Sequence, residues 1–236
     1  MTEQLDLLGG ASGPRARQMV LPLPHAPDRA VIPARSNAAA IALTDAWPGW
    51  PGPVALLVGP AGSGKSHILE AWAALAGAVT LGASSLADQA DRVPPGAAVA
   101  LDNADVVLTG ERAAAAERAL FHLINHLRSS RGTLLLASRR PLAAWPVALA
   151  DLRSRLRGAT VAALDGPDDG LMRMVATKLL AERGIEPGPA TLDTILARVE
   201  RSLTSLERAV RRIDEAALSE RRRVDRALVR RVLDAG

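Results

Sequence analysis

One stretch of sequence decides the fold of this chain: Val54-Ala55-Leu56-Leu57-Val58-Gly59-Pro60-Ala61-Gly62-Ser63-Gly64-Lys65-Ser66. Its apolar first part, Val54–Val58, is typical of a strand that is buried on both faces of a parallel sheet. Its second part, Gly59–Ser66, fits the pattern G-x-x-x-x-G-K-[ST], and a helical pattern runs on from Lys65 to Ala76. A strand, this loop and a helix in that order predict a binding site for phosphate groups.

The residue types in this loop suit that chemistry. Glycines allow backbone N–H groups to turn toward phosphate oxygens, and the start of the following helix adds positive potential. Lys65 supplies a positive charge to the outer phosphates, and the Ser66 hydroxyl is a ligand for Mg²⁺. The alternative is an ordinary glycine-rich turn. The expected phosphate-binding residues are Gly59, Pro60, Ala61, Gly62, Ser63, Gly64, Lys65 and Ser66.

Outward from the loop, short apolar runs alternate with helical patterns between residues 37 and 164. This alternation predicts a doubly wound α/β domain with a five-stranded parallel sheet. The expected strands are Val54–Val58, Ala78–Leu81, Ala98–Leu101, Thr133–Ala137 and Gly158–Leu164. The expected helices are Asn37–Trp47, Lys65–Ala76, Ser84–Asp91, Glu111–Ser129 and Leu152–Leu156.

Two further segments flank this domain. After Leu164 only helical patterns follow, so residues 165–236 are predicted to form a small helical domain. Its helices are expected at Pro167–Gly184, Gly188–Val199, Ser202–Arg221 and Asp225–Leu233. Residues 1–36 are rich in Gly, Pro and Arg without a sustained period, which predicts a flexible N-terminal arm.

Composition excludes several classes of protein. The chain of 236 residues has no cysteine, which excludes disulfides, thiolate catalysis and cysteine-ligated metals. No apolar run is long enough to cross a membrane, and the N-terminus lacks the segments of a signal peptide, so we expect a soluble cytoplasmic protein. The 29 basic residues are nearly balanced by 25 acidic ones, so charge is weak evidence for nucleic-acid binding.

A second candidate site lies where the apolar run Ala98–Leu101 ends in Asp102. If this strand lies beside Val54–Val58, the Asp102 carboxylate reaches the Mg²⁺ that Ser66 holds; otherwise Asp102 caps the following turn. The next residue is Asn103, whose amide can orient water but is a very poor base. We therefore expect slow intrinsic hydrolysis of nucleotide, or none without a partner.

Two more groups are candidates for contact with nucleotide. Ser138 stands at the end of the fourth expected strand, where it either senses the outermost phosphate or simply ends the strand. In Asp151–Arg157, the side chains of Arg153 and Arg157 share a helix face, whereas Arg155 points elsewhere. Arg155 is thus a candidate arginine finger for nucleotide held by a neighbouring protein, and a solvent-exposed basic helix is the alternative.

With these motifs the chain resembles the AAA+ ATPases, and within them the proteins related to DnaA, from about Gln18 to the C-terminus. The motifs that carry the resemblance are Gly59–Ser66 followed by His67, Leu101-Asp102-Asn103, Ser138-Arg139-Arg140-Pro141 and Leu152-Arg153-Ser154-Arg155-Leu156. The resemblance implies an AAA+ P-loop NTPase core at 37–164 with a helical lid at 165–236. It implies bound ADP or ATP with Mg²⁺, a place for His67 in the nucleotide site, and Arg155 as the finger acting on a partner's ATP.

The resemblance also gives meaning to two glutamine-containing patches in the arm. They are similar to the short peptides by which bacterial proteins dock on the DNA polymerase III β sliding clamp. The candidate clamp-binding residues are Gln4, Leu5, Leu7 and Leu8 in the first patch and Gln18, Met19, Leu21 and Leu23 in the second. Position favours the second patch, and a random apolar cluster is the alternative for both. DnaA is the other implied partner, and a homo-oligomer is also allowed.

Two departures from the family pattern weaken the case for vigorous ATP hydrolysis by the chain alone. Arg139 stands where the family usually has an acidic residue. Thr204 stands where the second sensor helix usually has an arginine, with Arg201 or Arg208 as candidate substitutes. The basic stretch Arg221–Arg231 is interpreted as a solvated helix paired with acids, and no aromatic residue lies nearby, so sequence-specific DNA binding is not expected.

Four functions stay open at this point. The first is a regulator that stimulates hydrolysis of DnaA-bound ATP through Arg155, and thereby negatively regulates the initiation of replication. The others are an autonomous AAA+ ATPase that acts as a replication loader, a clamp-binding adaptor with structural nucleotide, and a P-loop kinase for a small molecule. Asn103 and Thr204 argue against the autonomous ATPase, and the helical C-terminal segment has no purpose in a kinase.

Overall fold

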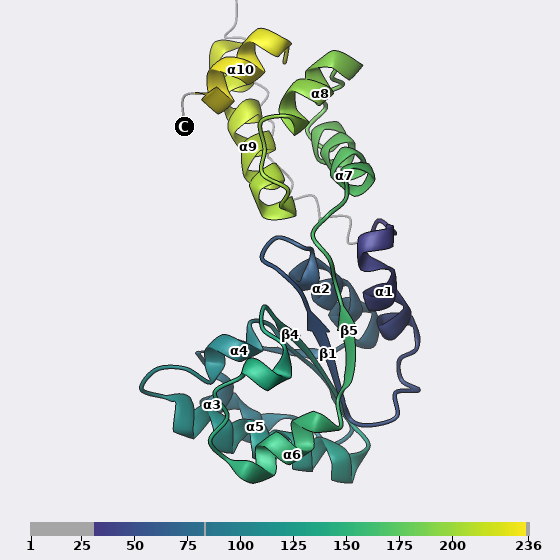
Figure 1. Cartoon of the computed structure of the whole chain (residues 1–236), viewed down its shortest axis with the longest axis vertical. Coiled ribbons are helices and arrows are strands. Elements are labelled where there is room, and N and C mark those ends of the chain that lie inside the picture. Colours follow the sequence, from purple (N-terminus) through teal and green to yellow (C-terminus); the bar gives the residue numbers. More distant parts are fainter. Residues whose placement is uncertain (1–30, 83, 235–236) are drawn as a thin grey trace, which may run out of the picture.

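The structure, a computed structural model, describes residues 31–82 and 84–234. Its centre is a five-stranded parallel sheet with the strand order β2-β3-β4-β1-β5, which confirms the expected sheet (Figure 1). The strands are β1 (Val54–Val58), β2 (Val79–Leu81), β3 (Ala98–Leu101), β4 (Thr133–Ser138) and β5 (Thr160–Ala163). One strand, β4, lies between β1 and β3, so the Asp102 strand is not the direct neighbour of the loop strand.

Helices cover the sheet and then continue as a separate helical layer. Those of the α/β part are η1 (Arg35–Asn37), α1 (Ala38–Asp45), α2 (Lys65–Ala76), α3 (Leu86–Gln89), η2 (Ala90–Arg92), α4 (Ala104–Val107), α5 (Ala113–Ser130), η3 (Leu142–Ala144) and α6 (Ala150–Arg157). The short α4 was not expected, because a helix of one turn is too short to show periodicity. No helix in the described part of the chain has the length and apolarity that crossing a bilayer requires.

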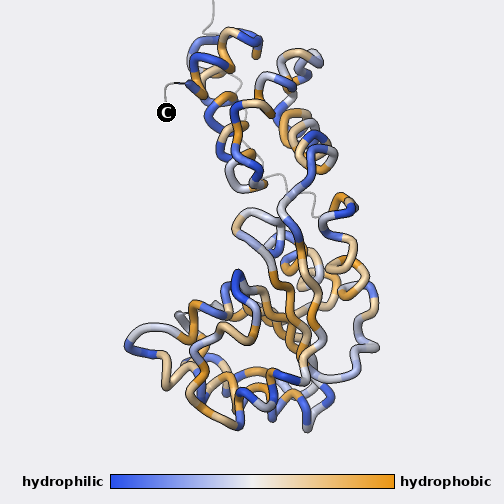
Figure 2. The backbone as a smooth tube through the Cα atoms, viewed as in Figure 1, coloured by the Kyte–Doolittle hydropathy of each residue, from blue (hydrophilic) through white to orange (hydrophobic). Residues whose placement is uncertain are grey.

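Burial on both faces fixes β1 inside the sheet, between β4 and β5. Side chains alternate along a strand, so Val54 and Leu56 join the apolar cluster under α3, α5 and α6. Ala55 and Leu57 join the cluster under α1 and α2 on the other face. All four side chains are at most 2% exposed, and the strands form the orange centre of the lower part of Figure 2. Full burial of each leucine or valine stabilises the fold by about 1.5–3 kcal/mol.

The helical domain lies above the sheet in Figure 1 and has an apolar core of its own. Its helices are α7 (Asp169–Ala181), α8 (Pro189–Leu196), α9 (Leu203–Glu220) and α10 (Arg226–Asp234). Leu206, Val210 and Ile213 of α9 are fully buried in this core. Two of these helices begin at side-chain caps, where Asp168 accepts the N–H of Leu171 and Ser202 accepts the N–H of Ser205.

The packed structure begins before residue 37, the expected start of the α/β domain. Val31 packs against the cluster under α1 and α2. The Ser36 carbonyl accepts the N–H of Asp165 at 3.0 Å, and Asn37 is 5% exposed. The remainder of the expected arm lies outside the described residues. So do all the candidate clamp-binding residues: Gln4, Leu5, Leu7, Leu8, Gln18, Met19, Leu21 and Leu23.

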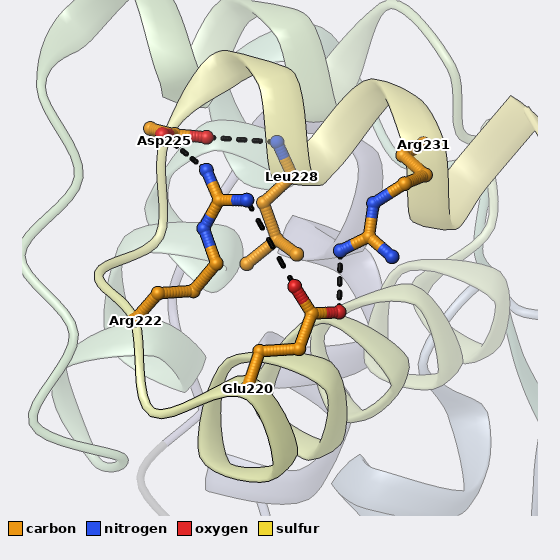
Figure 3. A network of polar contacts seen from close by, with 5 residues as sticks. All are labelled: Glu220, Arg222, Asp225, Leu228 and Arg231. Atoms are coloured by element: carbon orange, nitrogen blue, oxygen red, sulfur yellow. Dashed lines mark hydrogen bonds and ion pairs between the residues drawn. The ribbon is translucent and has the colours of Figure 1, made fainter.

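A polar network joins the end of α9 to the start of α10 (Figure 3). Asp225 Oδ1 accepts the N–H of Leu228 at 2.8 Å, and Asp225 Oδ2 accepts Arg222 Nη2 at 2.7 Å. Glu220 accepts a hydrogen bond from Arg231 and lies 3.8 Å from Arg222 Nη1. Two arginines of the basic stretch are therefore paired with acids, as the sequence suggested. The Leu228 N–H, followed by the Arg222 guanidinium, holds the pKa of Asp225 below its usual value.

This network predicts that α10 loosens in acid. Because the folded-state pKa of Asp225 is lowered, its carboxylate stabilises α10 above the unfolded-state pKa of about 3.9, and the contribution is lost as pH falls through the lower folded-state value. Amide protection of Leu228 and Val229, measured by hydrogen exchange, should fall between neutral pH and about pH 3. Asp225→Ala should give low protection at both pH values, whereas Asp151→Ala, at an exposed site on α6, should behave like the parent. Equal protection of the parent at both pH values would contradict the prediction.

Candidate functional site

The phosphate-loop sequence adopts a conformation that needs its glycines. The loop connects the end of β1 to the start of α2. Gly62 has φ of 70° and Gly64 has φ of 96°, a left-handed region that other residues enter at a cost. Space is short as well, since a Cβ on Gly62 would lie 1.9 Å from the Ser202 hydroxyl oxygen. The loop is therefore shaped by its own backbone and by the lid above it.

The Lys65 ammonium is held inside this loop. Its Nζ donates to the carbonyls of Gly59 at 2.8 Å and Pro60 at 2.7 Å, and lies 3.3 Å from the Ser63 hydroxyl. The residue is 7% exposed. Burial lowers the pKa of Lys65, the Asp102 carboxylate acts against this, and Arg139 lowers the pKa further. The ammonium is thus a desolvated charge whose acceptors are neutral carbonyls and a hydroxyl, and phosphate oxygens are stronger acceptors for it.

The two expected ligands of Mg²⁺ lie together. Ser66 Oγ donates to Asp102 Oδ2 at 2.7 Å, and Asp102 Oδ1 accepts the N–H of Asn103 at 2.7 Å. Asp102 reaches Ser66 across the end of β4, which is a longer reach than direct neighbours would need. No group of three or more His, Cys, Asp or Glu side chains suited to a metal occurs in the described ranges. A hydroxyl and one carboxylate are what a protein supplies to Mg²⁺ when phosphate and water complete its shell.

Asn103 follows with a left-handed backbone, φ 51° and ψ 41°, and begins α4. Asparagine tolerates this region better than most side chains. Asn103 lines the same cavity as Asp102. An amide and not a carboxylate therefore follows Asp102 at the cavity.

The Ser138 hydroxyl makes its hydrogen bonds with other residues of the protein interior. Its hydroxyl donates to the Arg140 carbonyl at 2.7 Å and accepts from Trp145 Nε1 at 3.1 Å. Ser138 is 1% exposed and, within the described part of the chain, is not among the residues that line the cavity. Its neighbour Arg139 does line it. A phosphate-sensing role for Ser138 therefore gains no support from its contacts.

Sequence reasoning missed several charged residues near the loop, and Asp105 is the most buried of them. Asp105 is 4% exposed, and its Oδ1 accepts the N–H of Arg139 at 3.3 Å. Its carboxylate also raises the pKa of Lys65, against the larger effect of burial. No pattern in the sequence marked Asp105, because the helix α4 that carries it is only one turn long and shows no periodicity.

A cavity of about 630 Å³ lies between the loop and the lid. Most of its apolar lining comes from the first described segment and from α7: Val31, Ile32, Leu171, Val175 and Leu179. Its polar lining includes the loop residues Ala61–Ser66, the exposed His67, and the ends of β3 and β4. The cavity thus combines an apolar wall with a loop built for anions.

The lid touches the loop directly. The Leu203 N–H, in the first turn of α9, donates to the Gly62 carbonyl at 2.9 Å. From α9, Leu203, Thr204 and Glu207 line the cavity, and neither Arg201 nor Arg208 is among the described lining residues. Arg201 instead binds Asp169 at 2.6 Å on the surface. Neither Arg201 nor Arg208 therefore replaces the arginine expected at the position that Thr204 occupies. The lid's cations at the cavity are Lys178, on α7, and Arg183, in the turn that follows α7.

Arg155 faces away from this cavity. The helix α6 is anchored by Leu152 and Leu156, which are 0% and 3% exposed. Arg153 donates to the Val147 carbonyl beneath the helix. The side chains of Arg155 and Arg157 are exposed and make no hydrogen bond or ion pair with described residues. The spacing predicted that Arg153 and Arg157 share one face of the helix. Of these two arginines, only Arg153 makes a hydrogen bond with another described residue.

The contact between Gly62 and the lid predicts a specific loss of stability. Gly62→Ala should lower the free energy of unfolding by about 1–2 kcal/mol from backbone strain alone, and displacement of Ser202 should add to that loss. Chemical denaturation of the protein without nucleotide measures the effect. Gly166→Ala is the control, because a Cβ there meets nothing within 4 Å. Equal stability of the two variants would rule out the tight contact.

Comparison with known proteins identifies the fold. No family model matches the chain. An uncharacterised protein of Haemophilus influenzae is 28% identical over 186 residues, which span 75% of this chain and 79% of that protein. Domain III of the Thermotoga maritima replication initiation protein DnaA superposes with a TM-score of 0.78 at 19% identity, covering 90% of this chain and 98% of that one.

Two larger structures superpose over most of this chain. AMPPCP-bound DnaA from Aquifex aeolicus has a TM-score of 0.64 at 19% identity, covering 80% of this chain and 65% of its own. The RuvB Holliday junction branch migration motor of Thermotoga maritima has a TM-score of 0.63 at 17% identity, covering 84% and 66%. The parallel sheet, the phosphate loop and the helical lid are thus those of one known architecture, and the chain has the α/β fold of the AAA+ P-loop ATPases.

Proposed function

We propose that this chain binds ADP or ATP with Mg²⁺ and uses Arg155 to stimulate hydrolysis of ATP held by DnaA. This is the role of Hda, the regulatory inactivator of DnaA, which the motifs of this chain resemble. The observation that carries the proposal is the contrast between two arginine positions. Arg155 is exposed and unpaired with described residues, away from the cavity, whereas Thr204 brings no cation from α9 into it. The chain is thus better equipped to serve a neighbour's site than its own.

Binding of adenine nucleotide follows from the lining of the cavity. The backbone of Gly59–Ser66 and the Lys65 ammonium would hold the phosphates. Ser66 and Asp102 would hold Mg²⁺, which neutralises phosphate charge when bound. Apolar residues such as Val31 and Val175 offer a surface for a base. The Aquifex DnaA structure of the same fold is AMPPCP-bound, which supports adenine as that base.

The chain's own site is poorly equipped for hydrolysis. Asn103 can orient a water molecule through its amide but cannot accept the proton that the water loses. Thr204 cannot neutralise phosphate charge in place of the family's arginine. The nucleotide bound here would therefore turn over slowly and act mainly to fix the position of the lid against the loop.

Arg155 would complete the site of a partner. A guanidinium placed near a transferring phosphoryl group stabilises its developing charge, and such fingers accelerate hydrolysis by roughly 10³–10⁵ in other systems. The proposed partner is DnaA carrying ATP, and the outcome is negative regulation of replication initiation. Docking on the DNA polymerase III β sliding clamp through the arm would bring Arg155 to DnaA only where clamp is loaded on DNA.

A mixing assay tests the proposal. DnaA loaded with radiolabelled ATP is combined with this protein, with and without clamp loaded on DNA. We expect hydrolysis to require both additions, and Arg155→Ala to abolish it while nucleotide and clamp binding are retained. Arg157→Ala is the matched control, since it removes an exposed arginine from the same helix. Stimulation that persists in Arg155→Ala would exclude the finger.

The same assay separates the remaining functions. Steady turnover of ATP by the purified protein alone would indicate an autonomous ATPase instead. Clamp binding without any effect on DnaA-bound ATP would indicate an adaptor in which nucleotide is structural. Each of these outcomes would overturn the proposed regulation.

The clamp-binding patches are tested separately. Changing Gln18 and Leu21 together to alanine should weaken binding to purified clamp by about tenfold or more, because both an amide hydrogen bond and an apolar anchor are lost. The control changes Gln4 and Leu7 in the same way. Surface plasmon resonance measures both affinities. Loss of binding only in the control would move the clamp site to the first patch, and loss in neither would remove the clamp from the proposal.

A further inference from the structure

We propose that the far end of the helical lid carries a binding surface for the phosphate backbone of duplex DNA, which it contacts without regard to base sequence. The surface consists of four arginines in the turn after α9 and on α10: Arg221, Arg223, Arg226 and Arg230. We call it the arginine surface. The inference goes beyond the proposed function and needs neither the nucleotide cavity nor Arg155.

The acids of this segment are already paired with other arginines. Glu220 accepts a hydrogen bond from Arg231 (Figure 3). Asp225 accepts one from Arg222 at 2.7 Å, and Asp234 pairs with another lid arginine at 2.8 Å. From Glu220 to Asp234 the sequence has six arginines against these three acids. The segment therefore keeps an excess of positive charge after its ion pairs have formed.

The side chains of the arginine surface carry that excess. All four are exposed, and within the described part of the chain none of them makes a hydrogen bond or an ion pair. The sequence interpretation of the whole stretch as arginines paired with acids thus holds for two of the six. Unpaired guanidinium groups are well suited to phosphate, which each can hold through two parallel hydrogen bonds.

The packing of α10 points its cations outward. Leu228 and Val229 are 0% exposed and belong to the side of the helix that faces the lid. Arg226 and Arg230 are one helical turn apart on the exposed side, where side chains at this spacing are neighbours. Like charges at this spacing repel one another, and a row of phosphates beside them relieves the repulsion.

The surroundings of the arginine surface favour duplex DNA over a lipid surface or a single strand. A helix that lies on a membrane needs an exposed apolar face, but α10 uses its apolar face in the lid. Among the described residues of α9 and α10, Leu218 is the large apolar side chain that is exposed, and it stands alone. No aromatic residue occurs from 202 to 236, so the bases of a single strand find no side chain to stack on. Duplex DNA instead presents closely spaced phosphates and asks for no contact with its bases.

The arginine surface lies apart from the other sites. Figure 1 shows α10 at the end of the helical domain that is far from the sheet, whereas α6, which carries Arg155, lies at the opposite end of the molecule. A contact with DNA at the lid would therefore add to the proposed docking on clamp loaded on DNA, because two linked contacts strengthen each other.

Fluorescence anisotropy with a labelled duplex tests the proposal. Binding is measured for the parent with two duplexes of unrelated sequence, without nucleotide, DnaA or clamp, and we expect the same affinity for both. Between about 50 and 200 mM salt, the slope of log K against log salt should be about −3 to −4, as four phosphate contacts require.

A double variant and a matched control locate the surface. Arg226→Gln combined with Arg230→Gln should weaken binding by about tenfold or more and make the slope shallower by about two. Arg118→Gln combined with Arg128→Gln removes the same charge from exposed positions on α5 and should bind like the parent. Thermal unfolding of both double variants checks that the exposed substitutions leave the fold intact.

Several results would overturn the proposal. They are an absence of DNA binding, equal losses in the two double variants, and a single strand bound more tightly than the duplex. Vesicles of phosphatidylglycerol and polyglutamate are tested at the same salt, and binding to either that matches the duplex would assign the surface to a membrane or to an acidic protein instead. Failure here leaves the stimulation of DnaA-bound ATP hydrolysis untouched, and failure of the mixing assay leaves DNA binding untouched.

Discussion

Everything at the site depends on the burial of β1. This strand lies between β4 and β5 and is covered on both faces, so its direction and end point are fixed by apolar packing and by hydrogen bonds on both edges. The phosphate loop starts at the point where that burial ends. A loop anchored in this way can hold Gly62 and Gly64 in left-handed conformations and keep the Lys65 ammonium enclosed by carbonyl oxygens.

The second constraint is the contact between loop and lid. The lid has its own apolar core, so α9 is a stiff element when its first turn meets Gly62. A backbone hydrogen bond of 2.9 Å and the close approach of Ser202 to Gly62 therefore join the two domains at the loop. Any ligand that lies in the cavity contacts both domains, because the lining comes from the loop, α7 and α9.

Charge is distributed unequally between this site and the outer surface. Lys65 and Arg139 face the cavity from the α/β domain, whereas Asn103 supplies an amide after Asp102 and Thr204 supplies no cation from α9. Arg155 carries its charge outward on α6. This arrangement is consistent with a protein that binds nucleotide firmly and supports chemistry in a partner, which is the basis of the proposed function.

Much of this could be read from local sequence. The P-loop motif, the apolar runs and the helical periods predicted each strand of the sheet and the helical domain, because burial on two faces and amphipathic spacing leave a direct record in the chain. The meeting of Ser66 and Asp102 was expected on the premise that their strands are direct neighbours; the two side chains do meet, but β4 lies between the strands. The short α4, with its buried Asp105, left no such record and was missed.

Tertiary structure alone decided the rest. Only the strand order shows that β4 separates β1 from β3. Only packing shows that Trp145 Nε1 donates a hydrogen bond to the Ser138 hydroxyl. Ser138 is therefore not among the described residues that line the cavity, whereas Arg139 is. Likewise, only the position of α9 shows that Arg201 and Arg208 do not stand in for Thr204. The physical reason is that sequence spacing sets which way a side chain points from its own strand or helix, whereas the groups it meets come from segments distant in the chain.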